Sequence, residues 1–378
     1  MGDATLYTVL PTHTAQAGIA LGGVGILLSA NRLIRVPLNG PAGLVYDRLP
    51  RRGLFIASLF IGALSTALYA ATRGFWPLLA GRLLWGLAWS GIWVGGATMI
   101  LDVAADRERG RWTGLYQTWF FLGSAAGALA GGVFTDWLGY AMTMWLGAGV
   151  TAFGGLVALL LLPETRPASP AGAARGLALP SLLRLGKGVW LAAFLHGINR
   201  FVIAGVLSAT LALLVQRNLV TLPLPVGVAS LTGILMAGRT LFSTFSAPLA
   251  GGLSDRFGDR WKVTLAGLLA GAVSMGLLGR SDPFSILSGI LLGALASGGL
   301  QTLVTAIIGD QVSLPQRGQA IGLLHTAGDL GSALGPPVAY AMLPVTGLPP
   351  IYGLCAGLFV VGLLVTLALF PLRRGNSF

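Results

Sequence analysis

Charged side chains interrupt several long apolar stretches of this 378-residue chain, and they are its most informative residues. A charged group is expensive inside hydrocarbon, so it is usually retained where it handles a substrate, an ion or a proton. Counting about 1.5 Å per helical residue places three of them, Arg35, Arg200 and Asp329, in one layer at mid-depth. The full set is Arg32, Arg35, Arg82, Arg200, Arg239 and Asp329, with Asp3 in a short apolar stretch at the start.

A histidine and a carboxylate on one helix predict proton chemistry. His325 precedes Asp329 by one helical turn, so the two side chains share a face. A histidine beside a carboxylate can titrate near neutral pH. Both residues are therefore candidates for carrying a coupling proton. The alternative for His325 is a hydrogen bond within the core.

The densest polar cluster in any apolar stretch is formed by His196, Asn199 and Arg200. The planar guanidinium fork of Arg200 suits a carboxylate or phosphate-like group. Five arginines face one secure carboxylate in these stretches, so we hypothesise an acidic substrate with Arg200 as its main contact. The alternative is that Arg200 bonds a backbone carbonyl or residues of an incomplete first helix.

Three further residues are candidates for lining a cavity. Trp89 lies in the middle of a tryptophan stripe at i, i+4 and i+8, from Trp85 to Trp93. Packing between helices, or contact with lipid, is the favoured reading of that stripe. The other two candidates are glutamines on other spans, so the three are Trp89, Gln117 and Gln301.

Composition identifies the class as membrane protein, because charged residues are 10% and apolar residues 54% of the chain. The net charge of +12 does not indicate nucleic-acid binding, since the basic residues lie in short loops. Neither a phosphate-binding loop, a metal site, a cofactor site nor a nucleophile–base pair is evident. We therefore expect no cofactor, no metal and no enzyme activity.

The apolar stretches predict an all-α membrane protein, since a span needs about 20 mostly apolar residues. The predicted spans are 17–42, 53–72, 75–101, 112–135, 140–162, 189–215, 224–250, 263–279, 283–309, 318–344 and 350–371, preceded by the fragment 2–11.

Orientation follows from the distribution of lysine and arginine between the loops. One side carries only Arg73, Arg217 and Arg280. The side that we assign to the cytoplasm carries Arg48, Arg51, Arg52, Arg107, Arg109, Arg111, Arg166, Arg175, Arg184, Lys187, Arg256, Arg260, Lys262, Arg317, Arg373 and Arg374. This places the C-terminus in the cytoplasm.

The chain is also an internal repeat, because a series of residues returns 208 positions later without a gap. Asp47-Arg48 returns as Asp255-Arg256, and Asp102 as Asp310. The head-to-tail order is typical of transporters with two parallel bundles. We expect an N-terminal bundle at 1–162, a cytoplasmic linker at 163–188 and a C-terminal bundle at 189–378. The same offset predicts that the first helix is incomplete; a native eleven-span chain is the alternative.

The loop after the first predicted span and its copy resemble the conserved G-x-x-x-D-R-x-G-R-R/K loop of the major facilitator superfamily. Pro50 replaces the inner glycine in the first copy, and Asp259 replaces an arginine in the second. The resemblance implies two six-helix bundles whose cytoplasmic ends are latched together by Asp47 and its arginines; positive loops that only set topology are the alternative. The latch residues are Gly43, Asp47, Arg48, Arg51, Gly251, Asp255 and Arg256.

Other motifs extend the resemblance. Arg82 and Gly86 are similar to the R-x-x-x-G pattern of proton-coupled members, which adds Arg82 to the proton-coupling candidates. In this family the helices of Arg35 and Asp329 face each other, which implies an ion pair between them; a purely structural pair is the alternative. The glycines of the span 112–135 resemble an antiporter signature, with close helix packing as the alternative. The residues that we name for packing are Gly123, Gly127, Gly131 and Gly132 in that span, and Gly335 and Pro336 in the span 318–344.

The sequence thus predicts a secondary transporter in the lipid bilayer, a monomer in a bacterial inner membrane, which exports a small organic molecule in exchange for protons. An uptake symporter or a facilitator for an organic anion is the first alternative. A transport-inactive membrane sensor or scaffold is the alternative from another class.

Overall fold

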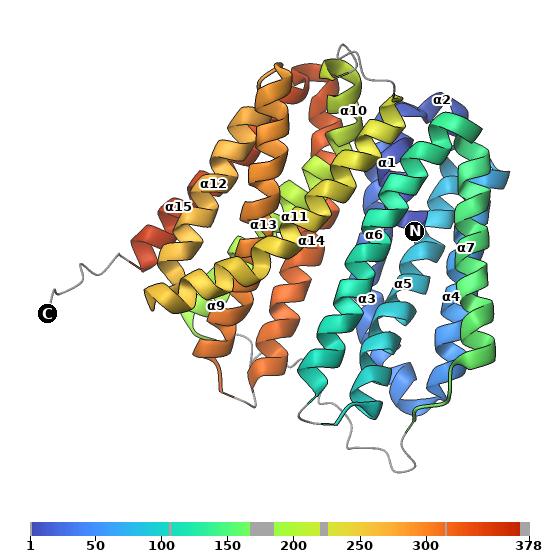
Figure 1. Cartoon of the computed structure of the whole chain (residues 1–378), viewed down its shortest axis with the longest axis horizontal. Helices are drawn as coiled ribbons and strands as arrows, with labels where there is room; N and C mark the ends of the chain where they lie inside the picture. The colour runs from blue at the N-terminus through green and yellow to red at the C-terminus, as the bar shows by residue number, and fades with distance from the viewer. Residues whose placement is uncertain (1, 106–107, 167–184, 220–225, 314–315, 371–378) are drawn as a thin grey trace, which may run out of the picture. The chain divides into compact units, whose positions relative to one another are not determined.

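The computed structural model describes residues 2–105, 108–166, 185–219, 226–313 and 316–370, and almost all of these are helical (Figure 1). No strand occurs within those ranges. The predicted all-α fold is therefore confirmed. Most of the predicted linker 163–188 lies outside the described residues. The same is true of several of the predicted cytoplasmic arginines, namely Arg107, Arg175, Arg184, Arg373 and Arg374.

Each predicted span coincides with a long helix, and the short apolar fragment coincides with α1. Ten of the described helical stretches are long and apolar enough to cross a membrane. The helices are α1 (Gly2–Val9), α2 (Thr14–Ala17), α3 (Leu21–Arg48), α4 (Arg51–Ala71), α5 (Phe75–Val103), α6 (Arg109–Leu138), α7 (Tyr140–Leu161), α9 (Lys187–Asn199), η2 (Arg200–Leu207), α10 (Ser208–Asn218), α11 (Val228–Phe257), α12 (Arg260–Leu278), α13 (Pro283–Gln311), α14 (Arg317–Thr346) and α15 (Leu348–Leu369), with the short η1 (Leu10–Thr12) after α1.

Several hydroxyl groups inside these helices are satisfied locally, which suits a hydrocarbon environment. The hydroxyls of Thr66 and Thr366, for example, donate to the carbonyls four residues earlier, at 3.0 and 2.7 Å. Large apolar side chains such as Leu160 are instead exposed, being 78% accessible in that case. Exposed leucine on a helix of this composition fits contact with lipid.

Two glycines show that the repeat extends to backbone conformation. Gly139 separates α6 from α7 with φ 82°, and Gly347 separates α14 from α15 with φ 74°. The two positions differ by the same 208 residues as the loop motifs. Only glycine adopts such a φ without strain, so the same tight turn joins the last two helices of each repeat.

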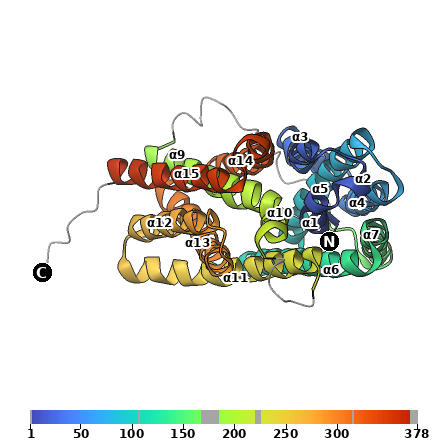
Figure 2. The same ribbon diagram turned by 90° about the horizontal axis from the view of Figure 1, so that it is seen from above.

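The described residues pack as two units, the first of which comprises Met1–Gly176 and Ser208–Gly238. Within it, α3 packs on α5, and α4 packs on both α5 and α7. The short α1 lies against α6 and also contacts α7 and α10 (Figure 2). The unit therefore combines helices of the first repeat with α10 and the start of α11 from the second.

The second unit comprises Leu177–Leu207 and Arg239–Phe378. Here α12 packs on α13 and α15, while α14 packs on α9 and η2. The helix formed by α9 and η2 also contacts α13, which places it at the centre of the unit. These boundaries group residues by contact rather than by repeat, and the predicted bundles at 1–162 and 189–378 stay a prediction.

Candidate functional site

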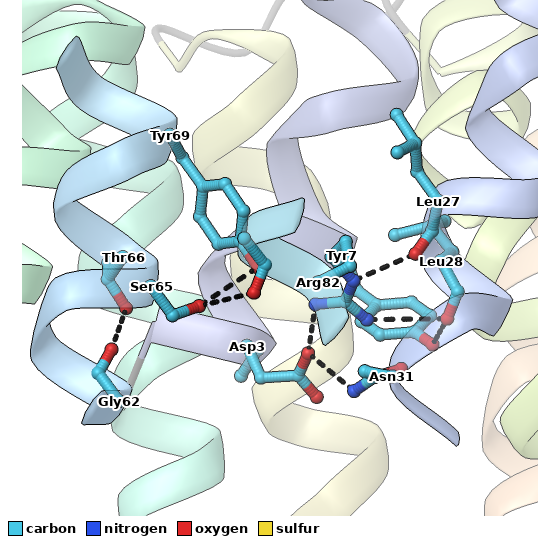
Figure 3. A network of polar contacts seen from close by, with 12 residues as sticks. Asp3, Tyr7, Leu27, Leu28, Asn31, Gly62, Ser65, Thr66, Tyr69 and Arg82 are labelled. Carbon is cyan, nitrogen blue, oxygen red and sulfur yellow. Dashed lines mark hydrogen bonds and ion pairs between the residues drawn. The ribbon is translucent and has the colours of Figure 1, made fainter. Parts of the chain in front are cut away.

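The first unit contains a fully buried arginine, Arg82 of α5. Its Nη1 donates to Asp3 Oδ1 of α1 at 2.5 Å, and its Nε donates to the Leu27 carbonyl of α3 at 2.8 Å (Figure 3). Its Nη2 donates to the Leu28 carbonyl at 3.3 Å. A carbonyl has two lone pairs, so these oxygens accept Arg82 as well as a helical N–H. One guanidinium thus holds three helices together.

Small residues let α5 approach α3 closely enough for this contact. A Cβ added to Gly86 would come within 2.7 Å of the Asn31 carbonyl oxygen and 3.2 Å of its Cα. Gly81, directly before Arg82, lies against a different helix, since a Cβ there would meet the Ser65 carbonyl of α4 at 3.3 Å. The two residues of the Arg82–Gly86 pattern therefore act together: Gly86 allows α3 to approach closely, and Arg82 donates hydrogen bonds to it.

Further polar groups surround the pair of charges. Asn31 Nδ2 donates to the same Asp3 oxygen at 3.2 Å, and the Tyr7 hydroxyl donates to the Leu28 carbonyl at 2.5 Å. The guanidinium of Arg32 lies 4.8 Å from the centre of the Tyr7 ring, a cation–π contact. The Asp3 side chain is 31% exposed, whereas that of Arg82 is 1% exposed. Asp3 is therefore the more exposed member of the ion pair.

The sequence analysis does not predict this pairing. It treats Asp3 as a charge in a short apolar fragment and Asp329 as the one secure carboxylate. The i, i+4 spacing from Asp3 to Tyr7 on one helical face was the available signal, because both contact α3 and Arg82. Which helix would receive that face depends on tertiary packing.

In the second unit, the predicted cluster of His196, Asn199 and Arg200, where α9 meets η2, lies against α14. A Cβ on Gly328 of α14 would come within 2.6 Å of His196 Nε2 and 3.3 Å of Arg200 Cγ. His325 lies within electrostatic range of Asp329 and Arg200. The structure thus brings His196, Arg200, His325 and Asp329 together. Asp329 and Arg35 belong to different units, and their pairing stays a prediction.

Two buried atoms of this cluster have no hydrogen-bond partner within the described ranges, namely His196 Nδ1 and Asn199 Oδ1. The Asn199 side chain is otherwise fixed, since its Nδ2 donates to the Ser297 carbonyl of α13 at 3.3 Å. Buried polar atoms are normally paired, so a buried acceptor without a protein partner is suited to a ligand or water. The role of this cluster in ligand binding stays a prediction.

Arg200 opens a stretch of π-helix, η2, between α9 and α10. Wider π turns are often found at functional sites, because they alter the direction of side chains and carbonyls. Arg239 Nη1 of α11 donates to the Ile203 carbonyl inside this stretch at 2.9 Å. The arginine at 239 therefore supports the backbone next to the cluster.

The tryptophan stripe is part of an aromatic cluster between α5 and α6. The Trp89 ring lies 5.8 Å from Trp93 and 5.2 Å from Phe120 of α6, measured between ring centres. Trp85 is buried, and Trp89 is half-buried. Packing between helices, the favoured reading, describes these contacts. Gln117 and Gln301 are exposed on α6 and α13.

The glycines named for packing differ in their surroundings. A Cβ on Gly335 would come within 2.6 Å of the Gly205 Cα, so α14 and η2 are in backbone contact there. Gly131 faces Thr5 of α1, whose hydroxyl donates to the Gly127 carbonyl at 2.9 Å. A Cβ on Gly123 would meet nothing within 4 Å, so close contact on α6 begins further along the helix. Pro336 follows Gly335 within α14 and is buried.

In each repeat, an arginine of the loop motif pairs with an aspartate near the C-terminal end of a neighbouring helix. Arg51 pairs with Asp102 of α5, and in the second repeat Arg260 Nε bonds Asp310 Oδ2 of α13 at 2.5 Å. Asp102 and Asp310 are repeat-equivalent positions. The four remaining charged latch residues, Asp47, Arg48, Asp255 and Arg256, are exposed at the ends of α3 and α11. Gly43 and Gly251 lie about one turn earlier on the same helices.

Different carboxylates cap the helix after each loop. Asp259, the departure from the family pattern, caps its own helix by accepting from Trp261 N at 3.0 Å. In the first repeat Glu164, which follows α7, accepts from Arg51 N at 3.0 Å and Arg52 N at 3.2 Å. Desolvation raises the pKa of Glu164, but these backbone N–H donors and that of Arg166 outweigh it and hold the pKa below its ordinary value.

Comparison with known proteins gives one family over the whole length. The profile of the Major Facilitator Superfamily matches residues 1–189 and again residues 189–377. The chain is 28% identical over 397 residues to the tetracycline resistance protein, class G, of Vibrio anguillarum, covering 99% of this chain and 94% of that protein. It is 35% identical over 138 residues to the multidrug resistance protein MdtG of Escherichia coli (strain 55989 / EAEC), covering 36% and 33%.

A solved structure with the same fold is that of the human organic anion transporter MFSD10 (TETRAN). It superposes with a TM-score of 0.67 at 19% identity, covering 97% of this chain and 95% of that one. At this identity the likeness concerns the fold.

Proposed function

Because the chain belongs to the Major Facilitator Superfamily, we propose that this multi-pass membrane transporter exports a small organic molecule in exchange for protons. The resemblance to tetracycline and multidrug resistance proteins supports export, since resistance through a transporter requires removal of the drug from the cell. Two parallel repeats around a central site suit alternating access.

The observation that carries proton coupling is the ion pair between buried Arg82 and partly exposed Asp3. Adding a proton to Asp3 removes the charge that balances Arg82 and weakens the bonds from Arg82 and Asn31. Because these bonds join α1, α3 and α5, protonation changes how the three helices are held. His325 and Asp329 form a second candidate proton site, in the other unit.

The substrate contact that we propose is the cluster where α9 meets η2, formed by His196, Asn199 and Arg200. The buried Nδ1 and Oδ1 atoms support this assignment, and the arginine fork matches an acidic group. An uptake symporter or facilitator for an organic anion is the alternative. The cytoplasmic C-terminus, the bacterial inner membrane and the monomeric state are parts of the same proposal.

The test is flux in proteoliposomes with purified protein, using labelled acidic, neutral and cationic substrates, with and without an imposed pH gradient. Export coupled to protons predicts that substrate moves toward the more acidic side. Substrate movement together with protons would favour the symporter, and gradient-independent flux the facilitator. Absence of flux for the whole panel would favour a sensor or scaffold.

A further inference from the structure

One aspartate caps a helix that belongs to the other sequence repeat. Asp136, near the end of α6, accepts a hydrogen bond from the backbone N–H of Ser230 in the first turn of α11 at 2.7 Å. The residue before α11 is Gly227, which has no side chain to act as a cap. A Cβ on Gly227 would overlap the Asp136 carboxylate, so the carboxylate occupies the position that a capping side chain would fill.

The other capped helices of the second repeat carry their own caps. Asp282 accepts from Ser285 N at 2.8 Å at the start of α13, and Asp259 caps α12. Both aspartates immediately precede the helix that they cap, whereas Asp136 lies 94 residues before Ser230. Asp136 therefore links two helices, whereas Asp282 and Asp259 each cap only the helix that follows them.

Beneath this cap, α6 and α11 are in backbone contact. A Cβ on Gly132 would come within 3.2 Å of the Ser230 Cα, and one on Gly233 within 2.5 Å of the Ala128 carbonyl oxygen. Ala128, Gly132 and Asp136 are spaced at i, i+4 and i+8, so they form one stripe along α6. Small residues at this spacing let helices approach closely in a membrane.

The contact joins the two repeats at the ends that we predict to be external. The unit that holds α6 also holds Ser208–Gly238 of the second repeat. On the same side, the Thr8 hydroxyl of α1 contacts Met236 Sδ of α11 at 3.6 Å, and α10 packs on α1. These contacts must separate if the external ends of the repeats part during transport.

We propose that Asp136 is an external latch residue, which stabilises the conformation in which α6 and the start of α11 are closed against each other. A carboxylate at a helix N-terminus is favoured by both the hydrogen bond and the helix dipole. The latch acts at the opposite ends of the repeats from the Asp47 loop. Its role in transport rests on the proposed alternating access, but the closed contact itself can be tested without substrate.

The experiment measures distances between spin labels on Met142→Cys and Gln216→Cys in a Cys355→Ala background. Both labelled positions are exposed, on α7 and α10, and Cys355 is the single cysteine. We expect Asp136→Ala to increase the population with separated labels about fivefold, which is the size expected for one helix cap. Asp136→Asn should give a smaller shift, because its amide oxygen still accepts the bond.

The matched control is Asp282→Ala, which removes a cap of the same kind within one helix and should leave the distances unchanged. A second pair tests the seam: Gly132→Leu should separate the labels, whereas Gly123→Leu, on the same helix but facing open space, should not. If Asp136→Ala does not fold, the glycine pair decides. Unchanged distances in both Asp136→Ala and Gly132→Leu, or an equal shift in Asp282→Ala, would overturn the proposal.

Discussion

At the scale of single residues, the buried charges of this transporter differ in the partners that surround them. Arg82 bonds a carboxylate and two carbonyls and is almost completely buried. Arg239 supports a π-helical carbonyl. The cluster around Arg200 instead includes buried polar atoms for which the described ranges hold no partner, those of His196 and Asn199. The burial and the hydrogen-bond partners of Arg82, Arg239 and Arg200 therefore distinguish three arginines that look alike in the sequence.

The Asp3–Arg82 pair predicts strong coupling between the two substitutions. Asp3→Asn should lower the free energy of unfolding by about 2–3 kcal/mol, because it leaves a buried charge without its counterion; the partial exposure of Asp3 keeps the loss below that of a fully buried pair. The double variant Asp3→Asn, Arg82→Gln should recover part of the loss. Thermal unfolding in detergent measures this cycle, and additive effects would argue against the pair.

Arg200 is predicted to select the acidic group of the substrate. Arg200→Ala should reduce flux of an acidic substrate more than Arg200→Lys, because lysine keeps the charge but loses the bidentate fork. The loss should be about tenfold or more for alanine, the range of a charge-assisted hydrogen bond. Efficient transport of lipophilic cations that is unaffected by Arg200→Ala would contradict the assignment.

At the scale of elements, several helix ends are completed by residues from elsewhere in the chain. Glu164 caps α4 from the end of α7, and the adjacent Thr165 hydroxyl bonds Asp102 Oδ2 at 3.2 Å. The same Asp102 pairs with Arg51 at the start of α4. These bonds tie the ends of α4, α5 and α7 into one cluster at the predicted cytoplasmic side.

The Glu164 cap predicts a specific pH dependence of stability. Its folded-state pKa lies below the usual value of 4.5, so its contribution is fully present above that value and is lost as the pH falls through the folded pKa. Glu164→Gln should therefore lower the melting temperature at neutral pH, with the difference from the unmodified protein shrinking below about pH 4.5. Glu108→Gln is the control, because the exposed Glu108 carboxylate accepts from the Trp112 indole at 3.3 Å rather than from backbone N–H groups. A difference that persists at the acidic end would contradict the cap.

The elements themselves could be predicted from the sequence, since apolar length and the 208-residue offset located every long helix. The same patterns could not locate contacts between distant helices. Asp3, Glu164 and Asp136 all act on another helix, across 79, 113 and 94 residues. The sequence also did not predict the positive φ of Gly139 and Gly347, because this conformation follows from the tight turn.

At the scale of the whole molecule, two repeats of one fold must change their contacts during transport. The loop motifs of both repeats are anchored to repeat-equivalent aspartates, Asp102 and Asp310. Asp47 and Asp255 are exposed beside these anchors. The anchors fix each loop to its own repeat. Asp255 also lies 3.6 Å from Arg260 Nη1, so Asp47 is the aspartate that we expect to act in the predicted cytoplasmic latch.

The cytoplasmic latch predicts that Asp47→Asn slows transport several-fold while leaving folding intact, because a neutral side chain gains less from a helix N-terminus. Asp255→Asn, at the equivalent position of the second repeat, provides the comparison. Initial rates of flux at matched protein levels measure the effect. Unchanged rates for Asp47→Asn would count against a latch at this loop.

The central claim is that substrate leaves in exchange for protons that bind at Asp3. The most direct measurement is the pH inside proteoliposomes, followed with a trapped dye while substrate is added outside, for the unmodified protein and for Asp3→Asn. We predict that substrate drives a pH change only with the unmodified protein, while Asp3→Asn still exchanges labelled for unlabelled substrate. An equal pH change with folded Asp3→Asn, or substrate transport by the unmodified protein without any pH change, would contradict the account.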